Sequence, residues 1–232
     1  IWNASEGLVH TEVEPEHSFQ SNTIKGTPAE PEIFTALNSC RTDIPLPAGW
    51  LWVSFNLQSE RNSDLNQFLS TLSPSEGDYI KEVIPFASYT PEKGWSGSLC
   101  NSGISLQKRY MVRLKNPDTL VVKGELANPE DYPIDLNYEW NRIGYLPSSN
   151  MTISNAFGQH NPEDGDLVKS QEGFAMYDAS FHDWIGTLDY MIPGKGYMYY
   201  SNNTDPVTFC YPKFGFMKSA RIDESVSGPW ET

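Results

Sequence analysis

His160 stands directly before an acidic loop, and together they form the first place in this chain where chemistry could occur. The loop reads NPEDGD and contains Glu163, Asp164 and Asp166. Imidazole and carboxylate groups bind divalent metals and transfer protons. A single histidine without a second ligand at metal spacing is more often a packed residue, and His160 falls on the inner face of a predicted helix. We therefore predict a structural role for His160.

Calcium is the metal that an acidic loop suits best, because it prefers oxygen ligands. The carboxylates of Glu163–Asp166 could bind it, as could those of Glu130 and Asp131. Neither loop has oxygen ligands at alternate positions, as an EF-hand has. Solvated turns are the preferred interpretation, calcium stays an alternative, and no other cofactor is indicated. The Gly-Asp pairs at Asp78 and Asp166 predict turns that the aspartate closes by accepting backbone N–H groups.

The sequence contains none of the common nucleophile motifs. It has no Gly-x-Ser-x-Gly, no cysteine placed with a histidine partner and no glycine-rich phosphate loop. The paired carboxylates of a glycosidase come from distant parts of a chain, so that alternative stays open. Its candidates are Glu163, Asp164 and Asp183, in a cleft that sets two carboxylates about 5–10 Å apart. His182 has no counterpart in the first copy of the repeat described below, so a catalytic role there would be confined to the second copy.

Aromatic side chains are the most informative residues for binding. Four tryptophans recur at equivalent positions of a repeat and are predicted to anchor the core: Trp50, Trp95, Trp140 and Trp184. Other aromatic residues occur in one copy only and are expected to face solvent, where they could stack on sugar rings or fill a pocket of a protein partner. The predicted ligand-binding residues are Trp52, Tyr190, Tyr199 and Tyr200. No catalytic or metal-binding residue is predicted.

A repeat positions these residues. GDYIKEVIPFASY begins at Gly77 and GDLVKSQEGFAMY begins at Gly165, with Gly-Asp, Lys, Phe-Ala and Tyr in the same places. Downstream, GWSGSL matches DWIGTL, and the shared Gly97 or Gly186 predicts a bulge or a close approach of two backbones. Self-similarity that carries aromatic residues and glycines indicates a duplicated structural unit. We predict two tandem homologous repeats with internal pseudo-symmetry.

Each repeat is predicted to run β, α, then an antiparallel meander. GWLWVSFNL is a β-branched and aromatic stretch and predicts a strand with both faces largely covered. NSDLNQFLSTL predicts a short amphipathic helix capped by Asn62 or Ser63, and its counterpart would be capped by Ser149 or Asn150. The fold class is therefore mainly β with short helices (α+β).

Four segments follow from this alignment. Residues 1–43 form an N-terminal segment, expected as part of a β-sandwich or as an arm along the repeats. Residues 44–128 are the first repeat and residues 129–204 the second. Residues 205–232 are expected to form a C-terminal β segment.

Composition excludes several classes of partner. The 232 residues carry 16 basic against 30 acidic side chains, a net charge of -14. This charge repels phosphate backbones and anionic membrane surfaces, so no nucleic-acid partner is expected. No apolar run approaches the roughly 20 residues of a membrane span. The first residues, IWNASEG, form no signal sequence, so we expect a processed product or a piece of a longer protein.

The three cysteines are too few and too scattered for a disulfide framework or a metal site. They are Cys40, Cys100 and Cys210. We predict three buried small side chains, with one disulfide bridge as the alternative.

Several segments resemble a tandem module of large secreted or surface-attached proteins of Bacteroidota. The pattern of that module is GWNWISFN…GDxIKSQxxFAxY…GWxGSL…PGxGYM, and this chain has GWLWVSFNL, GDLVKSQEGFAMY, GWSGSL and PGKGYMYY. The likeness covers residues 44–201, with Arg142 in the place of Trp52 and Glu139 where a glycine is usual. The resemblance implies an extracellular or cell-surface setting and no established enzyme activity, and it supplies no ligand.

The expected function is a non-catalytic binding or adhesion module outside the cell, part of a larger surface protein, with a glycan or protein ligand. One alternative is a carbohydrate-active enzyme or its accessory carbohydrate-binding domain. Another is a structural subunit of a surface filament or layer, which would self-associate. No motif in the sequence supports enzyme activity, and none excludes it.

Overall fold

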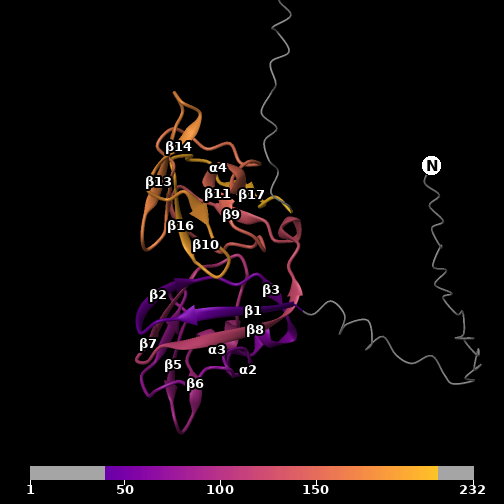
Figure 1. The fold of residues 1–232 in the computed structure, drawn as a ribbon, viewed down its shortest axis with the longest axis vertical. Coiled ribbons are helices and arrows are strands. Elements are labelled where there is room, and N and C mark those ends of the chain that lie inside the picture. Colours follow the sequence, from indigo (N-terminus) through magenta and orange to yellow (C-terminus); the bar gives the residue numbers. More distant parts are fainter. Residues whose placement is uncertain (1–39, 214–232) are drawn as a thin grey trace, which may run out of the picture.

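The computed structural model describes residues 40–213, and every structural statement below concerns that part of the chain. The chain is mainly β with short helices, as the sequence predicts. Figure 1 shows two bodies along the long axis: a first half, residues 40–126, and a second half, residues 129–213. The predicted segments 1–43 and 205–232 lie mostly outside the described residues. None of the helices in the described part has the length and apolarity needed to cross a bilayer.

Short strands and one-turn helices build each half. The first half contains β1 (Cys40–Leu46), β2 (Gly49–Val53), β3 (Leu57–Gln58), η2 (Glu60–Ser63), α2 (Leu65–Phe68), β4 (Tyr79–Lys81), β5 (Phe86–Thr90), β6 (Gly94–Ser96), α3 (Leu99–Ser102), β7 (Tyr110–Leu114) and β8 (Asp118–Leu126). The second half contains η3 (Pro129–Asp131), β9 (Ile134–Leu136), β10 (Glu139–Ile143), β11 (Met151–Thr152), α4 (Ile153–Ala156), β12 (Leu167–Lys169), β13 (Phe174–Asp178), β14 (Asp183–Gly186), β15 (Tyr190–Met191), β16 (Tyr197–Ser201) and β17 (Val207–Phe209). The boundary predicted between residues 43 and 44 therefore falls inside β1.

One five-stranded antiparallel sheet dominates each half. The strand order is β2-β7-β4-β5-β6 in the first half and β10-β16-β12-β13-β14 in the second. Beside each sheet runs a ribbon that pairs the start of the half with its end, β1 with β8 and β9 with β17. β3 pairs with the end of β8, and β11 pairs with β15. In Figure 1 the sheet of the second half lies to the left of α4.

Strand β2 shows why one face of the first sheet stays open. Successive side chains of a strand point to opposite faces, so Leu51 and Val53 share one face and Trp50 and Trp52 share the other. Val53 belongs to the same buried cluster as Phe68 of α2, whereas Trp50 is exposed. The prediction that both faces of this strand are largely covered is therefore wrong, because the helices pack on one side only.

The helices begin later in the chain than predicted. Asp64 caps α2, where Asn62 or Ser63 is predicted, because its carboxylate accepts two backbone N–H groups of the first turn at 3.0 and 3.1 Å. Thr152 caps α4, again later than predicted. Adjacent Asn, Ser, Thr and Asp residues are all good caps, so local preference alone could not choose among them.

Gly97 and Gly186 stand where two backbones approach closely, as the sequence predicts. A Cβ on Gly97 would overlap the carbonyl oxygen of Phe86, and a Cβ on Gly186 would overlap that of Phe174. Gly97 also has a φ of 145°, in the region that favours glycine. Glycine, which has no side chain, allows the backbone after β6 to lie this close to β5. Gly186 has the same role between β14 and β13.

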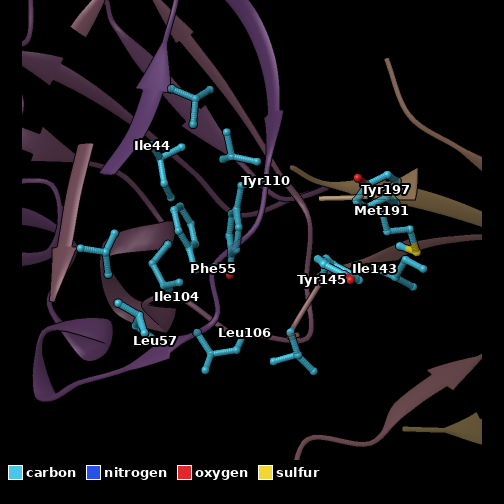
Figure 2. Close-up of a cluster of buried hydrophobic side chains, with 14 of the residues drawn as sticks. Ile44, Phe55, Leu57, Ile104, Leu106, Tyr110, Ile143, Tyr145, Met191 and Tyr197 are labelled. Atoms are coloured by element: carbon cyan, nitrogen blue, oxygen red, sulfur yellow. The ribbon is translucent and has the colours of Figure 1, made fainter. Parts of the chain in front are cut away.

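One buried hydrophobic cluster runs through both halves. Figure 2 shows Phe55 and Tyr110 of the first half in the same region of the core as Tyr145 and Tyr197 of the second. All four side chains are almost fully buried. Burial of this aromatic surface is a large favourable term in the stability of the core.

Backbone hydrogen bonds also join the halves. The N–H of Ser54 donates to the carbonyl oxygen of Gly194 at 3.2 Å, and the N–H of Gly144 donates to that of Gln107 at 2.9 Å. A Cβ on Gly144 would overlap the backbone of the loop that contains Gln107. Each half therefore both donates and accepts backbone hydrogen bonds at the junction.

Candidate functional site

The outer face of the first sheet carries the best candidate site. Residues opposite one another on neighbouring antiparallel strands share a face. One row across this face consists of Trp50, Arg113, Tyr79 and Ser88. The next row consists of Trp52, Met111, Lys81 and Phe86. The alternate residues of the same strands point into the core, so these two rows form the solvent side of the sheet.

The aromatic rings in these rows contact one another. The ring centroids of Trp50 and Tyr79 lie 6.0 Å apart with the rings edge to face, and Tyr79 stacks on Phe86 with centroids 5.6 Å apart. Trp50 is 42% exposed and Phe86 is 41% exposed. A contiguous exposed apolar patch of this kind is typical of an interaction surface.

Two cations lie beside the same rings. Lys81 Nζ and Arg113 Cζ are each 5.5 Å from the ring centroid of Trp50. The Nη2 of Arg113 also donates to the carbonyl oxygen of Gly77 at 2.9 Å. Cation–π attraction and this hydrogen bond hold the guanidinium over the face.

The second sheet has a corresponding outer face with a more apolar surface. Its rows consist of Trp140, Tyr200, Leu167, Met176 and Ile185, and of Arg142, Met198, Lys169 and Phe174. The rings of Trp140 and Tyr200 lie edge to face with centroids 5.2 Å apart. Trp140, Phe174, Met176 and Ile185 are all exposed. The row Met-Lys-Phe is common to both faces, whereas the polar Ser88 of the first face is replaced by Met176.

The structure does not bring the four predicted binding residues together. Trp52 lies half-buried at the edge of the first sheet, and Tyr200 lies half-buried on the second face beside Trp140. Tyr190 is exposed in β15, beside a shallow pocket on another side of the second half. Tyr199 is fully buried, so the expectation that it faces solvent is wrong: it alternates with Tyr200 along β16 and points into the core.

Two of the predicted core tryptophans are also placed differently. Trp95 is buried and Trp184 packs partly buried against the core, but Trp50 and Trp140 are exposed. The recurrence of a tryptophan at equivalent positions of the two aligned segments therefore does not show whether it is buried. The strand alternation in GWLWV carries the missing signal, because it puts Trp50 on the face opposite Val53.

A cavity of about 360 Å³ lies between the halves. Trp52, Ile44 and Pro45 of the first half and Ile192 and Pro193 of the second form much of its apolar wall. A volume of this size is at the lower limit of small-molecule sites. A smaller and more polar cavity of about 240 Å³ also lies between the halves, lined in part by Gln107 of the first half and by Asp135 and Arg142 of the second.

Polar groups at the larger cavity are already paired. Gln171 Nε2 donates to the carbonyl oxygen of Trp50 at 2.9 Å, and its Oε1 accepts the N–H of Trp52 at 2.5 Å. Lys195 Nζ binds Glu172 Oε2 at 2.5 Å. The cavity thus has few polar groups left to orient a ligand, and the sheet face is the better candidate.

Arg109 fills the space behind Trp52. Its Cζ lies 4.2 Å from the Trp52 ring centroid, and a Cβ on Gly196 would overlap its side chain. Arg109 is buried, and its Nε and Nη1 have no hydrogen-bond partner among the described residues. The pKa of Arg109 is lowered to about 10, mainly by burial and also by the charge of Arg142, while Glu82 opposes both effects. The contact with Trp52 offsets part of the cost of burying this charge.

The two sheet faces and the cavity are the candidate functional features of this chain. No protein family, curated protein or solved structure matches this chain. The function of these features is therefore inferred from their own geometry.

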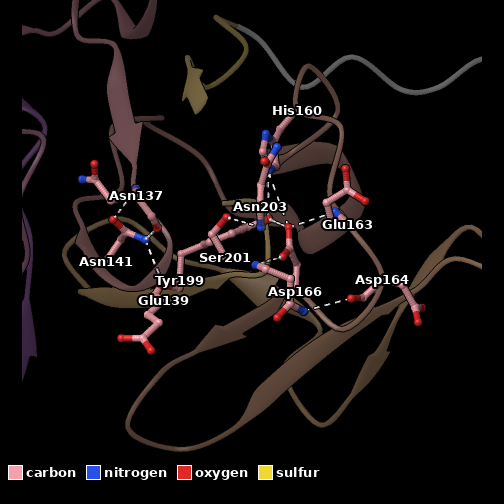
Figure 3. Close-up of polar contacts among 11 residues, drawn as sticks. Asn137, Glu139, Asn141, His160, Glu163, Asp164, Asp166, Tyr199, Ser201 and Asn203 are labelled. Carbon is pink, nitrogen blue, oxygen red and sulfur yellow. Dashed lines mark hydrogen bonds and ion pairs between the residues drawn. The ribbon is translucent and has the colours of Figure 1, made fainter. Parts of the chain in front are cut away.

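His160 belongs to a buried polar chain, in agreement with the predicted structural role. Tyr199 Oη donates to Asp166 Oδ2 at 2.6 Å, and His160 Nε2 lies 2.8 Å from Tyr199 Oη (Figure 3). Because the hydroxyl proton goes to Asp166, His160 Nε2 is the donor to Tyr199 and the neutral imidazole carries its proton there. His160 Nδ1 is buried without a hydrogen-bond partner among the described residues. In the first half the equivalent positions of His160 and Tyr199 are the apolar Leu72 and Val112.

Acidification is expected to destabilise the fold through His160. Burial lowers the pKa of His160 below its usual 6.5, and the nearby Asp166 carboxylate opposes this shift. Between the two pKa values the unfolded chain binds more protons, so the free energy of unfolding falls as the pH drops below about 6.5, by at most about 1.4 kcal/mol per pH unit. Urea titrations between about pH 7 and pH 5 check this. His160→Leu should have a shallower pH dependence, and equal slopes would contradict the assignment.

The acidic turns act as the sequence predicts. Asp78 accepts the N–H of Ser75 at 2.8 Å and that of Lys115 at 2.8 Å. Asp166 accepts the N–H of Glu163 at 3.0 Å and that of Asn202 at 2.7 Å. The predicted turn closure by these two aspartates is confirmed. Within residues 40–213 no group of three or more His, Cys, Asp or Glu side chains is arranged to hold a metal ion.

The carboxylates proposed for a glycosidase do not share one pocket. Asp183 lines a shallow pocket with Asp189 and Tyr190, and neither Glu163 nor Asp164 lines it. Asp183 Oδ1 accepts hydrogen bonds from Ser154 Oγ at 2.7 Å and from its neighbour's backbone N–H at 2.8 Å. This carboxylate is part of the hydrogen bonding that ties β14 to α4.

The cysteines form no disulfide. Cys40 is exposed, so the prediction of three buried side chains is wrong for this residue, which lies at the start of β1. Cys100 and Cys210 are half-buried, and burial raises the pKa of both thiols. A raised pKa leaves less thiolate and lowers the reactivity of these two cysteines.

Proposed function

We propose that this chain is a non-catalytic binding module, in an extracellular or cell-surface setting, and that its ligand is a glycan that lies across the outer face of the first sheet. The observation that carries the proposal is the contact series from Trp50 through Tyr79 to Phe86 on an exposed sheet face. Aromatic rings of this kind bury apolar faces of a ligand at a low cost in side-chain entropy. The setting rests on the resemblance of the repeated segments to modules of secreted proteins.

The sheet gives these rings a rigid base. β2, β7, β4 and β5 are hydrogen-bonded side by side, and their inward residues lie in the core. The rings therefore need little reorganisation before a ligand binds, which favours affinity. Polar side chains between the rings, such as Ser88 and Arg113, supply hydrogen-bonding groups that hydroxyl-rich sugars require.

A protein partner is the second candidate, and the second sheet favours it. Trp140, Phe174, Met176 and Ile185 are exposed on that face, and Tyr200 and Met176 stand there in place of the Arg113 and Ser88 of the first face. A largely apolar face of this kind resembles the centre of a protein–protein interface. On this proposal the second half docks on a neighbouring protein while the first half holds the glycan.

We also propose that the two halves are homologous repeats related by internal pseudo-symmetry. Their five-stranded sheets have corresponding strand orders. Ser54 and Gly144 each follow the matched tryptophan by four residues, and their N–H groups make corresponding bonds to Gly194 and Gln107. Asp78 and Asp166 accept corresponding backbone N–H groups. A backbone superposition of the two sheets in an experimental structure tests the proposal, and different strand paths would contradict it.

Trp50→Ala is expected to weaken glycan binding by about tenfold or more, because a tryptophan in contact with a ligand commonly contributes a large share of the binding energy. A glycan array identifies the ligand, and titration calorimetry then compares the variant with the parent chain. Phe181→Ala is the matched control, since Phe181 is an exposed aromatic residue outside the two strand rows. A hydrolysis assay on the bound glycan accompanies both measurements. Turnover of that glycan, or unchanged affinity in Trp50→Ala, would contradict the proposed function.

A further inference from the structure

The charge on the first sheet face differs from that of the chain as a whole. The chain has 30 acidic and 16 basic residues. The two rows on the outer face of β2, β7, β4 and β5 nevertheless contain Arg113 and Lys81 and no acidic residue. An acidic protein thus presents a local cationic surface at its most aromatic site.

Neither cation is neutralised by an ion pair. The ion pairs within residues 40–213 are Arg41 with Asp43 and Lys195 with Glu172. Among the described residues, the Arg113 guanidinium has only the Gly77 carbonyl and the Trp50 ring as partners, and Lys81 lies by the same ring. Their positive charges therefore remain available to a ligand that lies on the rings.

Ring and cation alternate across the sheet at the strand spacing of about 4.8 Å. The first row runs Trp50, Arg113, Tyr79, and the second runs through Lys81 to Phe86. A guanidinium binds carboxylate or sulfate through paired hydrogen bonds, and the neighbouring rings can stack on the apolar faces of sugar rings. Building on the proposed function, we infer that the ligand of this face is an acidic polysaccharide, whose sugar rings bear carboxylate or sulfate groups.

The second sheet provides an internal comparison. Tyr200 stands at the position of Arg113, Leu167 at that of Tyr79 and Met176 at that of Ser88. Lys169 keeps the place of Lys81, and a second cation, Arg142, stands at the position of Trp52. Of the two faces, only the first has a cation between two rings in one row, as in Trp50, Arg113 and Tyr79, and the acidic ligand is assigned to that face alone.

Paired polymers test the inference on the folded chain. Polygalacturonate is compared with its methyl ester, and dextran sulfate with dextran, by affinity electrophoresis and calorimetry. At least one acidic polymer should bind about tenfold or more tightly than its neutral form, and added salt should weaken that binding because exposed charges are screened. The carboxylate and sulfate pairs separate the two sources of charge. Arg113→Ala and Lys81→Ala should each reduce the acidic preference, and Lys169→Ala, the equivalent lysine on the second face, should leave it unchanged.

The possible failures are distinguishable. Equal binding of a neutral polymer and its acidic form, with Trp50→Ala still weakening both, overturns the acidic ligand and leaves the proposed function standing. An acidic preference that persists in both Arg113→Ala and Lys81→Ala overturns its assignment to this face. Binding of no glycan, neutral or acidic, overturns the proposed function and the inference together. Circular dichroism of each variant establishes that it is folded before binding is measured.

Discussion

Gly186→Ala is expected to lower the free energy of unfolding by about 3 kcal/mol, because the new methyl group would overlap backbone atoms that cannot move independently. The carbonyl oxygen of Phe174 and the Cα of Ala175 occupy the space that a Cβ would need. Relief requires separating β13 from β14 at the end of the hairpin, where Ala175 pairs with Gly186. Urea denaturation of the variant measures the loss through the shift in midpoint.

Gly49→Ala is the control for this prediction. Gly49 has a φ of 101°, but no atom lies within 4 Å of the position that its Cβ would occupy. Its replacement therefore tests backbone strain without overlap and should cost about 1–2 kcal/mol. A loss at Gly186 no larger than that at Gly49 would show that the two strands can separate easily. The same overlap at Gly97 predicts a comparable loss in the first half, with the strain of its positive φ added.

Asp166→Ala is expected to destabilise the chain by about 3–4 kcal/mol, because it leaves several buried donors without an acceptor. Asp166 accepts the backbone N–H of Glu163 and of Asn202 and the hydroxyl of Tyr199. The Tyr199 hydroxyl in turn is the partner of His160 Nε2. Removal of this one carboxylate therefore disrupts both the turn and the buried hydrogen-bond network of Tyr199 and His160. The free energy of unfolding from urea titrations is the measurement.

Asp78→Ala separates these two contributions. Asp78 closes the corresponding turn of the first half through two backbone N–H groups, without a tyrosine or histidine behind it. Its loss should cost about 2 kcal/mol, less than the loss at Asp166. Asp164→Ala is the surface control, since Asp164 is exposed and accepts one N–H at 2.9 Å, and it should cost about 1 kcal/mol or less. Equal losses at Asp78 and Asp166 would mean that the bonds to Tyr199 and His160 add no stability.

Burial of Tyr199 illustrates a result that sequence alignment could have reached. Tyr197 aligns with Tyr110, so Tyr199 aligns with Val112, and both members of that second pair are buried. Strand alternation then puts Tyr199 on the inner face and Tyr200 on the outer one. The prediction that Tyr199 faces solvent is wrong because presence in one copy of an aligned segment is not a sign of exposure. In the second half the hydrogen-bonded pair His160 and Tyr199 stands at the positions that align with the apolar Leu72 and Val112 of the first.

The exposure of Trp50 and Trp140 is of a different kind. GWLWV is apolar on both faces of the strand, so hydrophobicity could not show which face packs against the core. The answer depends on α2, α3 and the β1–β8 ribbon, whose apolar residues join only the Leu51 and Val53 side. The cations beside Trp50 are likewise contributed by β4 and β7, which lie about 30 and 60 residues further along the chain. The candidate site therefore combines strands whose pairing and register cannot be predicted from the sequence.

Local sequence determined the turns, the short helices, the close approach at Gly97 and Gly186 and the mainly β class, because each depends on the conformational preference of a few neighbouring residues. Tertiary structure alone decided which sheet face stays in solvent, which aromatic residues gather there, and that His160 meets Tyr199 and Asp166. Those features depend on contacts between segments far apart in the chain. Such contacts are chosen by the total surface that the fold can bury, and no single segment carries that information.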